Sequence, residues 1–245
     1  GLMLLPMVAG IMISSIGSGQ IISRTGRYKI FMQIGFLVAT ASMVALTFLT
    51  PETPYLYEAV VMTILGLGMG VAMPVLNLAI QNEVEQKDLG VATSSSQLFR
   101  SLGSTIGTAV FGAMLTAGIV SQVAAMKNTE YIKSLGQSSQ VSAIGNLDDA
   151  NTLLTLNTPD IKQKITDAAD AQFSKLPDAY ATKAREQFNT NQQEFASIVT
   201  HAFSDSLQRI FIVASSLVGF SAVMVFTLKE RTLRSAKPDA TPGEA

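Results

Sequence analysis

Uncharged apolar runs long enough to cross a lipid bilayer constrain this chain more than any other feature. The hydrocarbon core of a bilayer is about 30 Å thick, so a helix that rises about 1.5 Å per residue needs about 20 apolar residues to span it. The sequence holds five such runs, and only the fourth contains a charged residue, Arg100; the runs are residues 1–23, 30–49, 59–80, 98–123 and 210–228. Five runs of this kind in one short chain argue against buried helices of a soluble core, so we predict five transmembrane helices.

Composition points the same way. Only 14% of the residues are charged, whereas soluble domains carry about 25%. The net charge of −1 argues against nucleic-acid binding, which requires a basic face, and the absence of cysteine excludes disulfides and thiol nucleophiles. A single histidine, His201, cannot build a metal site alone. Because no nucleophile–base pair or metal constellation is visible, we predict neither an enzyme nor a cofactor.

Lysine and arginine in the short connectors set the predicted orientation, since cytoplasmic loops carry an excess of both. The connector at residues 24–29 holds three cations and no acid, the one at 50–58 holds no cation, and the one at 81–97 holds a single cation. Four cations follow the last run. We therefore place the tail, 229–245, in the cytoplasm and the long segment 124–209 outside, in a multi-pass membrane protein.

The segment 124–209 is the one hydrophilic module between the predicted spans, and we expect it to form two or three small helices. Residues 136–146 form a low-complexity linker. Thr158, Pro159 and Asp160 form a helix start, with a capping residue, a proline at the first helical position and an acid near the positive end of the helix dipole. Leu176-Pro177 should end that helix. The module therefore reads as a helical extracytoplasmic insertion.

The connector between the first two runs carries a motif of glycines and cations. Gly19 is followed by Arg24, Gly26, Arg27 and Lys29. This spacing resembles the signature loop of the major facilitator superfamily, which joins the second and third helices of each six-helix half. We call residues 19–29 the signature loop. Serine stands at position 23, where the family has an acid, and Tyr28 interrupts the basic pair, as in a degenerate second-half copy.

Two later segments, residues 66–74 and 97–107, look like helices of the fourteen-helix drug:proton antiporter branch of this family. The resemblance implies an all-α polytopic membrane protein, with five helices of a six-helix half and the missing helix upstream. The chain opens at Gly1 inside an apolar run, which we interpret as the tail end of a longer polypeptide.

The resemblance also implies a function. It is export of drugs or toxic amphiphiles by proton antiport and alternating access, with the bilayer, a small amphiphilic substrate and protons as partners. One alternative is export of an endogenous lipid, peptide or metabolite on the same scaffold. A membrane-anchored sensor or scaffold is an alternative of a different class.

Candidate cavity or gating residues lie in the third and fourth runs. Met62, Met69, Met73 and Asn77 share one helical face, where polarizable methionines suit promiscuous apolar binding and equally suit ordinary packing. Arg100 is an intramembrane charge and so a functional candidate, although a side chain near the cytoplasmic end can also reach water. No Asp or Glu lies inside any run, so we expect the proton-coupling carboxylates upstream.

Overall fold

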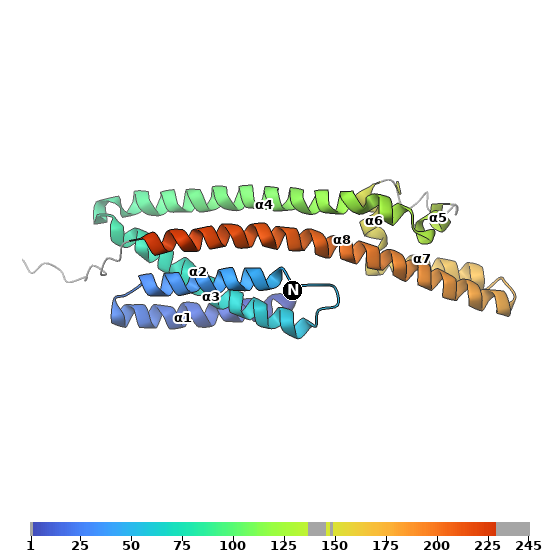
Figure 1. Cartoon of the computed structure of the whole chain (residues 1–245), viewed down its shortest axis with the longest axis horizontal. Helices are drawn as coiled ribbons and strands as arrows, with labels where there is room; N and C mark the ends of the chain where they lie inside the picture. Colours follow the sequence, from blue (N-terminus) through green and yellow to red (C-terminus); the bar gives the residue numbers. More distant parts are fainter. Residues whose placement is uncertain (1, 137–145, 148, 229–245) are drawn as a thin grey trace, which may run out of the picture. The chain divides into compact units, whose positions relative to one another are not determined.

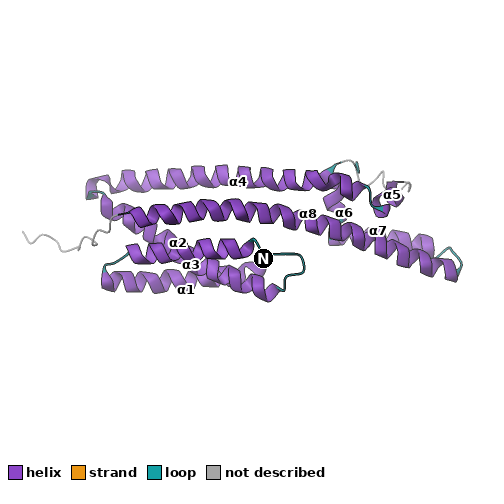
Figure 2. Cartoon of the chain, in the orientation of Figure 1, coloured by secondary structure: helices purple, strands orange, loops and turns teal. Residues whose placement is uncertain are grey.

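The computed structural model describes residues 2–136, 146–147 and 149–228, and every regular element within them is a helix (Figure 2). Most of the predicted linker at 136–146 and the predicted tail at 229–245 lie outside the described residues. In chain order the α-helices (Figure 1) are α1 (Leu5–Thr25), α2 (Lys29–Leu46), α3 (Tyr55–Glu83), α4 (Leu89–Lys127), α5 (Glu130–Gly136), α6 (Ala150–Leu156), α7 (Pro159–Phe173) and α8 (Asp178–Thr227).

Five of these helices, α1 to α4 and α8, are long and apolar enough to cross a membrane. The prediction of an all-α chain with five spans is therefore confirmed. The helices α4 and α8 contain 39 and 50 residues, or about 58 Å and 75 Å at the usual rise. Each is thus much longer than the bilayer core of about 30 Å. The predicted spans 98–123 and 210–228 are apolar parts of longer continuous helices, because helix-forming polar residues extend them without a proline.

The chain divides into two compact units. Of the described residues, the bundle unit comprises 2–49, 53–108 and 211–228, and the insertion unit comprises those within 50–52 and 109–210. The predicted domain limits at residues 123 and 209 mark where the bilayer should end, and these remain predictions.

In the bundle unit, α3 packs against both α1 and α2 through glycines that face different neighbours. A Cβ added at Gly66 would overlap the backbone carbonyl of Met7 on α1, whereas one added at Gly68 would lie 2.7 Å from the backbone nitrogen of Ala39 on α2. Small residues let membrane helices approach closely enough for their backbones to touch. The alternating glycines of this segment therefore hold α3 between two partners.

The end of α8 belongs to the same bundle unit. Val225 lies in a buried cluster with Ile22, Tyr28, Met32 and Val75. Farther up the helix, Phe211 and Val218 pack against a second cluster formed by Ala39, Leu46, Val61 and Leu65. The last turns of α8 thus complete the packing that α1, α2 and α3 begin.

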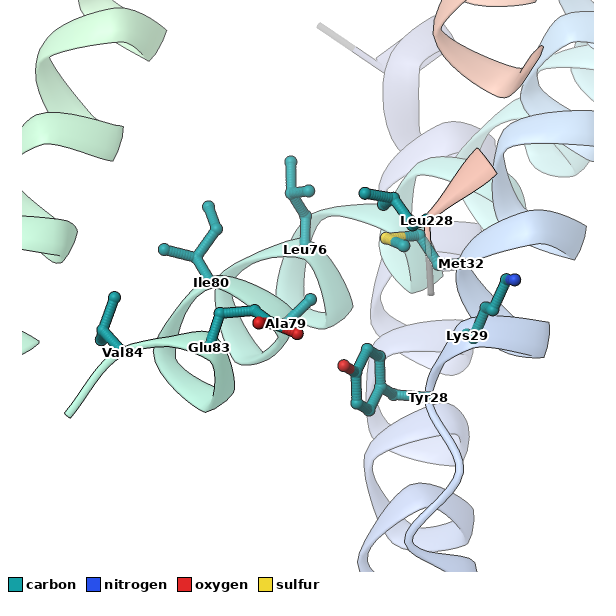
Figure 3. A pocket seen from close by; sticks show the side chains of 9 residues that line it. All are labelled: Tyr28, Lys29, Met32, Leu76, Ala79, Ile80, Glu83, Val84 and Leu228. Atoms are coloured by element: carbon teal, nitrogen blue, oxygen red, sulfur yellow. The ribbon is translucent and has the colours of Figure 1, made fainter. Parts of the chain in front are cut away.

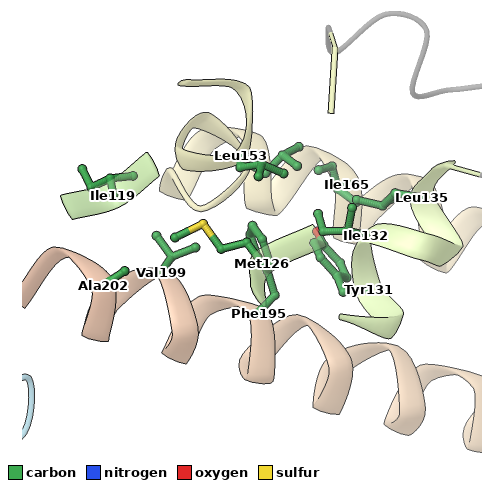
Figure 4. Packing of buried hydrophobic residues seen from close by; sticks show 11 residues of the cluster. Ile119, Met126, Tyr131, Ile132, Leu135, Leu153, Ile165, Phe195, Val199 and Ala202 are labelled. Atoms are coloured by element: carbon green, nitrogen blue, oxygen red, sulfur yellow. The ribbon is translucent and has the colours of Figure 1, made fainter. Parts of the chain in front are cut away.

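The insertion unit has its own apolar core, to which parts of α4 and α8 contribute together with α5, α6 and α7 (Figure 4). The Tyr131 ring is fully buried, with its centroid 5.3 Å from that of Phe195. Gln192 donates hydrogen bonds to the Tyr131 hydroxyl and to Thr166 Oγ1, both at 3.2 Å. Burial raises the pKa of Tyr131, and the Gln192 hydrogen bond offsets part of that rise. The phenol therefore stays neutral in this core.

The predicted helix start in the insertion unit is confirmed. The helix α7 begins at Pro159 with Thr158 as its N-cap residue. The Thr158 hydroxyl donates back to the Thr155 carbonyl at 2.7 Å instead of capping the new helix. The helix ends at Phe173, and α8 begins at Asp178 after the predicted Leu176-Pro177 break. The proline at the start of α7 and the Leu176-Pro177 break thus mark the helix limits correctly.

Candidate functional site

The turn in the signature loop depends on one glycine, Gly26. Gly26 ends α1 with φ of 69°, and its N–H donates to the Ile22 carbonyl at 2.8 Å. A residue with a Cβ is strained in this left-handed conformation, whereas glycine is not. An added Cβ at Gly26 would meet no atom within 4 Å, so the backbone conformation alone requires the glycine. The chain then reverses, and α2 begins at Lys29.

Tyr28, which interrupts the basic pair, anchors this turn. Its side chain is only 3% exposed and packs with Ile22, Met32 and Val75. Sequence reasoning treated Tyr28 as a departure from the motif and missed this role. The i, i+4 spacing of Tyr28 and Met32 was the available signal, because it places two large apolar groups on one face of the helix start.

The remaining motif positions have less contact. An added Cβ at Gly19 would meet no atom within 4 Å, so no helix approaches closely at this glycine among the described residues. Ser23, at the position of the family acid, donates to the Gln20 carbonyl of its own helix at 2.8 Å. Arg24 and Arg27 are exposed and Lys29 is half-buried. The loop is therefore a capped turn with cations on its surface.

The methionines on the predicted face of α3 differ in burial. Met69 packs against the cluster that contains Ala39 and Leu65. Met62 is half-buried, whereas Met73 is 42% exposed. Ordinary packing accounts for Met69, and a cavity lined by all three methionines remains a prediction.

Arg100 and Asn77, predicted separately as candidates, are brought together. The Arg100 Nη2 atom donates to Asn77 Oδ1 at 2.7 Å, which joins α4 to α3 within the bundle unit. The pair lies one turn beyond Pro74, a proline inside α3. Proline cannot supply the helical N–H and disturbs the preceding turn. A charge-assisted hydrogen bond thus links two helices next to a weak point in one of them.

The described residues show no candidate metal-binding site. The described part of the chain contains no group of three or more His, Cys, Asp or Glu side chains that could hold a metal ion. His201 Nε2 lies 3.3 Å from Glu52 Oε1 in the insertion unit, and both side chains are more than half exposed. Exposed pairs of this kind contribute little to stability.

Comparison with known proteins identifies the family. The sequence profile of the Major Facilitator Superfamily matches residues 1–108, which cover α1, α2, α3 and the first half of α4. Residues 1–108 of the chain therefore carry the sequence pattern of the major facilitator superfamily. The prediction made from the signature loop is therefore confirmed, and the relatives are transporters rather than enzymes.

Individual relatives extend the match beyond those helices. The chain is 31% identical over 244 residues to multidrug transporter protein MdtP of Bacillus subtilis, a match covering 98% of this chain and 41% of MdtP. It is 25% identical to Multidrug resistance protein 3 of the same bacterium, covering 96% and 41% of the two chains. An uncharacterized MFS-type transporter of Mycobacterium tuberculosis is 43% identical over 114 residues, covering 46% of this chain and 17% of the relative.

The chain thus spans 41% or less of the length of each of these relatives. No solved structure matches it significantly.

Proposed function

We propose that this chain forms the membrane bundle and insertion of a secondary transporter that exports drugs or toxic amphiphilic compounds. The observation that carries the proposal is the match of 98% of the chain to a relative named as a multidrug transporter. That match includes the insertion unit as well as the bundle. The proposed location is the bacterial plasma membrane, with residues 124–209 outside and the C-terminus in the cytoplasm.

Proton antiport and alternating access are the mechanism we propose for this export. No Asp or Glu lies within the five predicted spans, and a proton-coupled transporter needs a titratable group in the membrane. We therefore assign the coupling carboxylates to the part of the transporter that the relatives have and this chain does not span. The residues described here serve substrate passage and helix movement.

The Arg100–Asn77 hydrogen bond is the proposed gating element in this chain. The link joins α3 to α4 immediately after the Pro74 turn. When α3 bends at Pro74, the distance between Asn77 and α4 must change, so the link can persist in one state of the transport cycle and break in the other. Switching elements of this kind need two discrete arrangements of packed helices.

Substitution of both partners tests the proposal in the full-length protein. We expect Arg100→Gln to lower dye efflux from energised vesicles about two- to tenfold, since this hydrogen bond is at an exposed site and an ordinary hydrogen bond contributes about 0.5–1.5 kcal/mol. Arg100→Lys should rescue only part of the efflux, because ammonium does not reproduce the planar guanidinium fork. Asn77→Ala should resemble Arg100→Gln, and the double variant should be no worse than either single one.

Lys87→Gln is the matched control, because Lys87 is an exposed cation that pairs with Glu85 in the short connection between α3 and α4. This variant should transport like the wild type. Wild-type efflux by Arg100→Gln at equal expression would refute the gating role.

A further inference from the structure

A cavity of about 480 Å³ lies in the bundle unit where α2 begins and α3 ends (Figure 3). Nine residues from α2, from α3 and its end, and from the end of α8 line it. Pockets that hold small ligands typically measure about 300–1,000 Å³. The cavity is therefore large enough for a small ligand. The roles proposed above for the signature loop and the Arg100–Asn77 link do not use this cavity.

The walls of this cavity suit hydrocarbon. Six of the nine lining residues are apolar: Met32, Leu76, Ala79, Ile80, Val84 and Leu228. The polar lining consists of Tyr28, Lys29 and Glu83. A mostly apolar cavity with a few polar groups at one level fits an amphiphile, whose chain occupies the cavity and whose head group meets the charges.

The cavity lies at the ends of candidate membrane spans. The helix α2 begins at Lys29 and α3 ends at Glu83, so these two charges mark the level where the apolar spans meet water. The same connector carries Arg24 and Arg27, with no acid among residues 24–29. Clusters of cations at the cytoplasmic ends of transmembrane helices attract anionic lipid head groups.

The two charged lining residues come from different helices. In Figure 3, Tyr28 lies between Lys29, on the α2 side, and Glu83, near the end of α3. The Glu83 carboxylate disfavours an anion on its own side of the cavity, so a phosphate is favoured at Lys29 and the adjoining loop cations. Both the charges and the apolar surface therefore favour a ligand whose head group lies at Lys29 and whose hydrocarbon chain lies in the cavity.

We propose that this cavity binds an anionic phospholipid of the cytoplasmic leaflet. One acyl chain lies against Met32, Leu76 and Ile80, and the phosphate pairs with Lys29. Lys29 in the lining, together with the exposed Arg24 and Arg27 of the adjoining connector, favours an anionic head group over a cationic drug. Such a lipid would lie against Tyr28, whose ring anchors the turn between α1 and α2, and so would stabilise the loop.

The test measures lipid retention by the purified full-length protein in nanodiscs of phosphatidylglycerol and phosphatidylcholine in equal amounts. Native mass spectrometry should detect bound phosphatidylglycerol in excess over phosphatidylcholine. Lys29→Gln should lower phosphatidylglycerol retention about fivefold, the factor expected for one cation near a membrane surface. Lys87→Gln, which removes an exposed cation outside the cavity, should retain lipid like the wild type.

A second variant tests the cavity itself. Ala79→Phe adds a ring to the lining and should lower retention of phosphatidylglycerol while leaving Lys29 in place. Equal retention of the two lipids by the wild type would overturn the proposal. Unchanged phosphatidylglycerol retention by Lys29→Gln would do the same. Lipid retention is measured without transport, so this result stands or falls separately from the proposed export.

Discussion

At the scale of single residues, the signature loop combines one backbone requirement with one buried anchor. The sequence indicated that Gly26 and the cations belong to a family motif. It did not indicate which glycine is conformationally required, because Gly19 and Gly26 look alike in the motif. The structure separates them, since Gly26 alone has positive φ and both have open space around the missing Cβ.

Substitution of Gly26 should therefore destabilise the turn by straining the backbone, because φ is positive, and not by steric overlap with neighbouring atoms. A residue with a Cβ pays about 1–2 kcal/mol in the left-handed region, and asparagine is tolerated better than other residues. We expect the unfolding temperature of the full-length protein to fall in the order Gly26→Asn, Gly26→Ala, Gly26→Val, with valine lowest, and drug efflux to fall in the same order.

Gly19→Ala provides the matched control for this series, because a Cβ at that position meets no atom within 4 Å and the residue lies within α1. Its unfolding temperature should equal or exceed that of the wild type. An unchanged unfolding temperature in Gly26→Val would contradict the proposed backbone requirement.

At the scale of elements, the existence of the helices could be predicted from the sequence and their partners could not. Runs of apolar residues fix where a helix crosses the bilayer, because lipid leaves the backbone no other way to satisfy its hydrogen bonds. Polar residues mark where a span leaves the membrane but do not end a helix, so α4 and α8 exceed their predicted spans. Similarly, the sequence places Gly66, Gly68 and Gly70 in one apolar run without indicating which neighbouring helix each one meets.

Contact between α2 and α3 at Gly68 yields a sharp test. A methyl group added there would lie 2.7 Å from the Ala39 backbone nitrogen and 2.8 Å from the Gly35 carbonyl oxygen. Neither backbone atom can move without its helix, so Gly68→Ala should cost about 1–3 kcal/mol, as overpacked cores do. The loss should appear as a lower thermal unfolding temperature of the purified full-length protein.

Gly90→Ala is the control for that comparison, since Gly90 lies in the first turn of α4 with nothing within 4 Å of its missing Cβ. A helical Gly→Ala change without strain stabilises by about 0.4–1 kcal/mol. Equal unfolding temperatures for the two alanine variants would contradict close packing at Gly68.

At the scale of the whole molecule, family membership and the number of spans could be read from the sequence, because both depend on long apolar runs and one spaced motif. The Arg100–Asn77 link could not, since the two residues are 23 positions apart and the sequence does not indicate whether α4 passes close enough to α3 for them to meet. Orientation in the membrane rests on the distribution of lysine and arginine.

Cysteine labelling tests that orientation, and the absence of native cysteine from this chain makes it practical. In a full-length protein without other cysteines, Gln187→Cys on the exposed surface of the insertion unit should react with an impermeant maleimide added to intact cells. Thr25→Cys in the signature loop should react only after the cells are permeabilised. The opposite pattern would reverse the proposed topology.

Transport by the purified full-length protein in proteoliposomes tests the central claim most directly. An imposed proton gradient should drive uptake of a fluorescent amphiphilic drug into vesicles whose lumen is acidic, because antiport exchanges outgoing protons for incoming drug. Collapse of the gradient with nigericin should abolish that uptake, and Arg100→Gln should reduce it about two- to tenfold, in line with the loss of a hydrogen bond at an exposed site. Drug movement at the same rate with and without the proton gradient would contradict the account.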